Sequence, residues 1–240
     1  MTTRSLSQRL AWISAGATVA FGLGHIGSTW YRYGRAGVEK GSDPLLDRFM
    51  PACDVRERHA IRVAAPAAET WAATLALDLQ RSRMVRAIFR GRELLMGAER
   101  TEDVVRQALL PWALSLGWGV LAEEPGRQIV VGGFTRPWEA NPRFRSLPPG
   151  EFGSFAEPRY VKIVWTFAVE PLGPAASLAV TETRVVATDA YARKRFRPYW
   201  TLASPGIVLI RRQSLRLVKA DAERRYRDRS AAEARDHVWP

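Results

Sequence analysis

The sequence contains few of the residues that bind metals or form disulfides. Cys53 is the single cysteine of the 240 residues, and a lone cysteine excludes an internal disulfide. The three histidines, His25, His59 and His237, are far apart in the chain, and with one cysteine they do not match the ligand spacing of a transition-metal cluster. The sequence therefore predicts neither a metal site nor a bound cofactor, and it leaves the redox compartment undecided.

Acidic residues are also scarce. The 24 Asp and Glu face 36 Lys and Arg, which gives a net charge of +12 and a pI of about 10.7. Thirteen of the basic residues but only five of the acidic ones lie between residues 190 and 240. Such a surface attracts anionic lipid or nucleic acid, or is a solvated basic face. Because no helix-turn-helix, zinc-finger or aromatic RNA-binding pattern is present, we expect no nucleic-acid partner.

Charge is absent from residues 10–31, apart from the titratable His25, and a short basic tail, residues 1–9, precedes this run. At 1.5 Å per residue, these 22 residues just cross a bilayer core of about 30 Å. Trp30, Tyr31 and Arg32 at its end are typical of an interfacial anchor. We expect a single-pass membrane helix, with a cleaved secretory signal and a soluble helix as alternatives. Arginines on both sides leave the orientation undecided.

The same run contains Gly22, Gly24 and Gly27 in a G-x-G-x-x-G pattern. A dinucleotide site needs this loop inside a βαβ unit, with an acidic residue about twenty positions later. Here the chain continues into residues 32–52, which are rich in Gly, Pro and charge and are predicted to be a linker. Small residues in a membrane helix explain the glycines better.

After the linker, hydrophobic periodicity predicts a succession of short elements and one long final helix. Alternation predicts strands at residues 57–64, 160–170 and 178–188, the last two antiparallel, and a hairpin from apolar segments 112–121 and 128–134. Helical spacing predicts helices at residues 67–79 and 83–95, one that begins at Thr101, and a long amphipathic helix from residue 190 to about 229 with a break at Ser204-Pro205-Gly206.

The order of these strands and helices, together with several residues, resembles that of bacterial proteins of the SRPBCC superfamily. They are Leu178–Val185, Thr188-Asp189, Arg195-Phe196, Tyr199-Trp200 and Leu209–Arg212. The resemblance covers residues 53–228 and leaves 229–240 as a polar tail. It implies an α+β, START-like helix-grip fold, in which a curved antiparallel sheet wraps around a long C-terminal helix and an elongated apolar pocket lies between them. Members of this superfamily bind many ligands and only some are enzymes, so no catalytic residue follows from the resemblance.

Polar and aromatic side chains on inward faces are the candidates for ligand contact. We selected seven: His59, Trp138, Trp165, Glu182, Arg184, Tyr199 and Trp200. His59 shares a strand face with apolar residues, and Trp165 is central in the clearest strand. Glu182 and Arg184 orient a ligand head group if their face is inward, and form a solvated surface pair if Thr181 and Thr183 face inward instead. For each candidate, an ordinary packing role is the alternative.

The sequence favours a membrane-tethered binding or transport protein for a hydrophobic small molecule or lipid. The alternative is an enzyme of the polyketide cyclase or dehydratase type, in which His59 and Glu182 act as acid and base in the same cavity. A third possibility is a structural membrane protein whose pocket is filled by side chains. The ligand and the oligomeric state stay open.

Overall fold

The computed structural model describes residues 24, 27–28, 33, 43–97 and 107–236. The helices are α2 (Pro44–Asp47), α3 (Ala67–Leu75), the 3-10 helix η1 (Leu79–Arg81), α4 (Arg83–Met96), α5 (Leu109–Ser115), α6 (Pro149–Phe152) and α7 (Ala190–Asp236). The strands are β1 (Val55–Val63), β2 (Gly119–Glu124), β3 (Gln128–Thr135), β4 (Val161–Gly173) and β5 (Ala176–Ala187). The predicted helix at Thr101 and nearly all of the predicted membrane segment lie outside the described residues.

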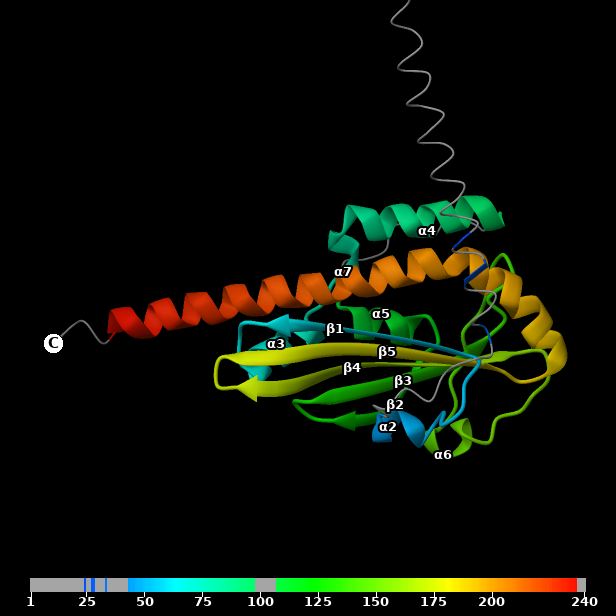
Figure 1. Cartoon of the computed structure of the whole chain (residues 1–240), viewed down its shortest axis with the longest axis horizontal. Coiled ribbons are helices and arrows are strands. Elements are labelled where there is room, and N and C mark those ends of the chain that lie inside the picture. The colour runs from blue at the N-terminus through cyan, green and yellow to red at the C-terminus, as the bar shows by residue number, and fades with distance from the viewer. Residues whose placement is uncertain (1–23, 25–26, 29–32, 34–42, 98–106, 237–240) are drawn as a thin grey trace, which may run out of the picture.

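The five strands form one antiparallel sheet in the order β1-β5-β4-β3-β2 (Figure 1). β4 and β5 form its central hairpin, in which Trp165 pairs with Thr183 and Phe167 with Thr181. Because paired residues of antiparallel strands point to the same face, this register assigns every side chain to one of two faces. We call the face with Trp165, Phe167, Thr181 and Thr183 the helix face, and the opposite one the outer face.

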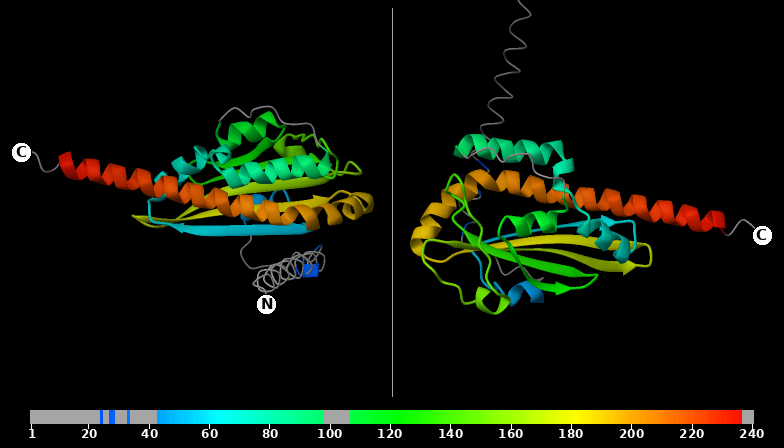
Figure 2. Two further views of the ribbon diagram at one scale, coloured as in Figure 1. Left: turned by 90° about the horizontal axis from the view of Figure 1, so that it is seen from above. Right: turned by 180° about the vertical axis from the view of Figure 1, so that it is seen from behind.

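α7 crosses the helix face, lying mainly over β1 and β5 (Figure 2, left). Leu215, Val218 and Ala222 of α7 join Trp71 of α3 and Phe167 of β4 in the largest apolar cluster. A sheet with the C-terminal helix across one face is the helix-grip arrangement, so the predicted fold class is confirmed. α4 runs beside α7 (Figures 1 and 2).

α7 is continuous over its 47 residues, so the predicted break at Ser204-Pro205-Gly206 is wrong. Pro198 and Pro205 lie inside the helix, where each removes one backbone hydrogen bond. The helix bends in its first third, in the part that contains them (Figure 1). Burial of Phe196, Trp200 and Ser204 along one side keeps the helix intact there. α7 also continues to Asp236, so most of the segment predicted to be a polar tail is helical.

A second layer covers the outer face. Leu45, Leu46 and Met50, in and after α2, pack with Phe152 of α6 and Val164 of β4. These residues fall partly in the predicted linker, whose last ten residues are therefore a packed part of the domain. The side chain of Asp43 caps α2 by accepting hydrogen bonds from the amides of Leu45 and Leu46 at 3.0 and 3.1 Å. The centre of the sheet is thus buried on both faces, while its edge strands β1 and β2 stay partly exposed.

Two further differences from the predicted elements matter for the site. Leu109–Ser115 is the helix α5, not the beginning of a strand, and β2 starts only at Gly119.

Among the residues that the structure describes, no helix has the length and apolar character needed to cross a membrane.

Candidate ligand-binding site between the sheet and the helices

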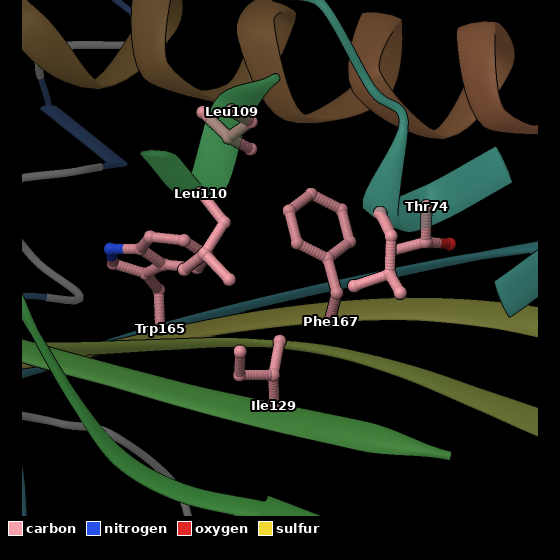
Figure 3. Close-up of a pocket in the computed structure, with 7 residues that line it drawn as sticks. Thr74, Leu109, Leu110, Ile129, Trp165 and Phe167 are labelled. Carbon is pink, nitrogen blue, oxygen red and sulfur yellow. The ribbon is translucent and has the colours of Figure 1, made fainter. Parts of the chain in front are cut away.

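An apolar hollow lies on the helix face, between the sheet and α5 (Figure 3). Trp165 and Phe167 rise from β4 and Ile129 from β3, and Leu110 and Leu109 close the hollow from above. Thr74 and Leu75 of α3 complete the lining. Its volume is about 10 Å³, roughly what one water molecule needs. The elongated pocket predicted between the sheet and the last helix is not seen here: no residue of α7 lines this hollow, which its own side chains close. In the described residues this matches the alternative in which side chains fill the pocket.

Trp165 is the only one of the seven candidate residues that lines this hollow. Its ring lies 6.0 Å from that of Phe167 and 6.1 Å from that of Trp118, both edge to face. Trp118 in turn stacks on Phe144 at 4.5 Å. Trp165 thus joins the hollow to an aromatic group that reaches the loop after β3.

A polar cluster adjoins the hollow on the same face. Thr181 and Thr183 are the β5 neighbours of Phe167 and Trp165, and His59 and Glu57 are the β1 neighbours of these threonines. Arg211 approaches from α7, and its Nη1 donates a hydrogen bond to Thr181 Oγ1 at 2.9 Å. We call Glu57, His59, Thr181, Thr183 and Arg211 the polar cluster.

Three buried atoms of the polar cluster have no hydrogen-bond partner within the described structure: Nε2 of His59, Oγ1 of Thr183 and Nε of Arg211. Burial lowers the pKa of Arg211 to about 10, against the opposing effect of Glu57 and Glu182, so Arg211 stays a cation at neutral pH. Burial, together with Arg211 and Arg212, lowers the pKa of His59, so its imidazole is neutral at pH 7. Its 3.7 Å contact with Glu57 is therefore no ion pair.

A half-buried cation, a neutral imidazole and a free hydroxyl next to an apolar floor suit an anionic group joined to an apolar one. Arg211 was not among the predicted site residues, because in the sequence it interrupts the apolar stripe of the last helix. The spacing contained a usable signal: Arg211 follows Ile207 by four residues and precedes Leu215 by four, so it lies on the sheet side of α7.

Glu182 and Arg184 lie on the outer face, away from α7 and from the polar cluster. They are 1% and 2% exposed. Glu182 accepts hydrogen bonds from Arg56 and Arg184, both at 2.7 Å, and Arg184 also reaches Asp47 at 2.5 Å and the carbonyl of Met50 at 2.8 Å. Burial alone would lower the pKa of Arg184, but the hydrogen bonds to Asp47 and Glu182 raise it.

This placement differs from both sequence-based alternatives for Glu182 and Arg184. Thr181 and Thr183 do face inward, but the charged pair is buried under α2 instead of solvated. The pair attaches α2 to the sheet, so it cannot hold the head group of a ligand bound under α7. His59 and Glu182 lie on opposite faces of the sheet, so they cannot act together as acid and base on one ligand.

Trp138, Tyr199 and Trp200 gather at the start of α7. Trp200 is buried in the apolar cluster of that region, with its ring 5.7 Å from that of Phe196, while Tyr199 and Trp138 are half-buried against the same cluster. None of the three lines the hollow. Their contacts are those of core packing at the end of the sheet.

A larger groove of about 230 Å³ lies on the outer face. Its polar lining is Asp43, Arg58, Arg127, Gln128 and Glu170, so both charge signs are present and neither a cation nor an anion is favoured. Among the described residues, no three His, Cys, Asp or Glu side chains are grouped as a metal ion would require.

No protein-family model matches the sequence, and comparison with curated proteins finds no relative. Solved structures with a similar arrangement include a hypothetical protein from Helicobacter pylori, at 7% identity and a TM-score of 0.39, covering 78% of this chain and 99% of that one. A START superfamily protein from Mycobacterium smegmatis is 11% identical with a TM-score of 0.29, and the match covers 72% of this chain and 97% of that one. The ZhuI aromatase/cyclase from a Streptomyces species is 15% identical with a TM-score of 0.25, and the match covers 71% of this chain and 94% of that one. At TM-scores below 0.5, these similarities indicate no ligand or activity for this chain.

Proposed function

We propose that the protein is a membrane-tethered binding or transport protein for a lipid-like molecule with an acidic head group. The ligand is held on the helix face of the sheet, with its head group under α7 and its apolar part under α5. The observation that carries this proposal is Arg211, a cation turned toward the sheet with an unused donor atom, next to the unpartnered polar atoms of His59 and Thr183. Leaving buried polar atoms unpaired costs free energy, and a ligand anion would remove that cost at this position.

The apolar part of the ligand would occupy the hollow above Trp165 and Phe167. At about 10 Å³ the hollow has no room for it, so the lid of the hollow has to move outward. α5 is the element best suited to do so, because Ala113 is the single buried residue among its seven. Elements with so few buried contacts open at low free-energy cost.

The head group would lie one strand away from the apolar part. Thr181 and Thr183 are the direct β5 partners of Phe167 and Trp165, so the floor changes from apolar to polar within one strand spacing of about 4.8 Å. An acidic head group on Arg211 gains charge-assisted hydrogen bonds, which are stronger than neutral ones. The site thus distinguishes an acid from the corresponding alcohol.

The tether belongs to the same proposal. Residues 10–31 have the length and composition of a single membrane span. A bilayer anchor would hold the site close to the phase in which a poorly soluble ligand is dissolved.

The test is a titration of detergent-purified full-length protein with oleate and with oleyl alcohol, followed by tryptophan fluorescence, with Trp165 as the reporter in the site. We expect oleate to bind more tightly than the alcohol. Arg211→Met removes the head-group contact and should weaken oleate binding about tenfold or more, with little effect on the alcohol. Arg227→Met, on the exposed part of α7, is the matched control. Equal binding of acid and alcohol by the unaltered protein would refute the acidic head group.

Extraction with organic solvent followed by mass spectrometry identifies the natural ligand and separates a carrier from an enzyme. A carrier releases the molecule it bound, with its mass unchanged after incubation. The cyclase-type alternative retains one supporting feature, the neutral imidazole of His59 on the helix face, and predicts a change in mass that His59→Gln abolishes.

A further inference from the structure

The first half of α7 carries an apolar stripe on its outward side. Pro198, Leu202, Pro205 and Leu209 follow one another at intervals of four, three and four residues, so they share one side of the helix. All four are exposed, Leu202 by 68% and Leu209 by 44%. The opposite side of the same turns packs on the sheet. α4 borders this side of α7 at Gly206, where Ile88 packs, but the two leucines of the stripe stay exposed and form a contiguous apolar surface.

Basic residues stand at both ends of this stripe. Lys194 and Arg195 precede it, Arg212 and Arg216 follow it, and all four are exposed. No charged residue of either sign occurs from Pro198 to Ile210. Apolar side chains on the outer side of a helix with cations at the ends are what a helix lying at the surface of an anionic bilayer requires, because the apolar groups enter the acyl boundary and the cations meet lipid phosphates.

Tyr33, near the N-terminus, lies against the part of α7 where the apolar stripe begins. Tyr33 packs on Phe196 with ring centroids 6.0 Å apart, and the guanidinium of Arg197 lies 5.8 Å from the centre of the Tyr33 ring. The uncharged run of residues 10–31 ends two residues before Tyr33. It therefore joins the domain within one turn of Pro198, where the stripe begins.

We infer that the stripe on α7 is a second membrane contact, which lies in the head-group region of an anionic bilayer next to the membrane-inserted run. This inference rests on the tether proposed above and adds to it the orientation of the domain. α7 faces the lipid, and the sheet with α2 and α6 faces water. The polar cluster and the hollow then lie one helix diameter from the membrane surface, about 10 Å.

The test places a fluorophore on the stripe. Cys53 is the only native cysteine, so Cys53→Ser combined with Leu202→Cys gives one labelling position. Cys53→Ser with Ser154→Cys is the matched control, because Ser154 is exposed and follows α6 on the other side of the sheet (Figure 1). Each full-length protein carries an environment-sensitive label and is reconstituted into vesicles of phosphatidylcholine with phosphatidylglycerol, with and without head-group-level spin-labelled lipid.

We expect the label at position 202 to shift to shorter wavelength and to lose most of its fluorescence to the spin-labelled lipid, while the label at position 154 does neither. Replacing Arg212 and Arg216 by Glu should reverse most of the quenching at position 202. A blue shift without quenching shows that protein covers the stripe, either residues 10–31 or a second copy, and overturns the inference. An unshifted label at 202 on vesicle-bound protein also overturns it. Protein that does not associate with vesicles at all refutes the tether itself.

Discussion

Nε of Arg184 donates a hydrogen bond to Oε1 of Glu182 at 2.7 Å, between two side chains that are adjacent on the same face of β5 and almost completely buried. Arg56 from β1 binds the same carboxylate, and Asp47 at the end of α2 binds the other side of Arg184. Two cations and two carboxylates are thus enclosed between the sheet and α2. Glu182 and Arg184 depend on these neighbours, because neither can be solvated instead.

Replacing Glu182 by Gln is expected to destabilise the protein by about 3–5 kcal/mol, because Arg56 loses this carboxylate and Arg184 keeps only Asp47 as an acidic partner. Glu170→Gln is the matched control: Glu170 is half-exposed, its contact with Arg58 is 3.9 Å, and its loss should cost less than about 1 kcal/mol. Denaturant unfolding followed by circular dichroism gives both values. Similar losses for the two variants would mean that the buried network contributes no more than a surface pair.

The alternation of β4 and β5 was enough to predict both strands and their pairing, but it could not predict which face α7 covers. Alternation separates inside from outside only when one face is solvated. Here the outer face is covered too, by Leu45, Leu46 and Met50 from a segment in which Gly, Pro and charge predominate. Glu182 and Arg184 were therefore assigned to the wrong environment, although the strand that carries them was predicted.

Local signals failed at α7 and α5 for related reasons. Ser204-Pro205-Gly206 predicts a helix break, and the helix continues because the residues on either side bury Trp200 and Leu215 against the sheet and α3. In α5, apolar residues 109–115 show no periodicity that separates a short helix from a strand. Arg211 was missed because a charged residue in an apolar stripe is ordinarily taken as its edge. Its spacing places it on the sheet side of α7, but its contact with Thr181 depends on how the helix packs.

The stability of the protein should fall on mild acidification because of His59. Its pKa is lowered in the folded state, so below the unfolded value of about 6.5 the unfolded chain takes up a proton that the folded chain does not. The contribution of His59 to the stability is then fully present above that pH and is lost as the pH falls below it. Between pH 7.5 and 5.5, the unaltered protein should therefore lose more unfolding free energy than His59→Gln.

Denaturant titrations of both proteins at the two pH values measure this difference, since the titration of surface carboxylates is common to both. An equal pH dependence would show that His59 is solvated in the folded state. Bound oleate should reduce the difference, because an anion next to the imidazole favours its protonated form.

Gly117, between α5 and β2, is expected to tolerate no side chain. Its φ of 98° is unfavourable for other residues, and an added Cβ would overlap the backbone carbonyl of Phe144. Gly117→Ala should therefore cost about 3 kcal/mol or more in unfolding free energy. Gly126, in the β2–β3 turn, has a φ of 79° but nothing within 4 Å of an added Cβ, so Gly126→Ala should cost only about 1 kcal/mol. If the two variants were equally stable, the contact between Gly117 and the loop after β3 would be absent.

Tyr33 should respond in opposite directions to two substitutions. Its hydroxyl is buried without a hydrogen-bond partner in the described part of the chain, and burial raises its pKa, an effect to which Asp54 adds. Tyr33→Phe removes the unpaired hydroxyl and keeps the ring on Phe196, so we expect no loss of stability and a gain of up to about 1 kcal/mol. Tyr33→Ala removes the ring as well and should cost about 3 kcal/mol, because the apolar cluster at the start of α7 loses its cover.

Thermal unfolding of the full-length protein in detergent distinguishes the two, and a destabilised Tyr33→Phe variant would mean that the hydroxyl has a partner after all. Because Tyr33 attaches the end of the uncharged run to α7, Tyr33→Ala should also lower the quenching of a label at position 202, whereas Tyr33→Phe should leave it unchanged.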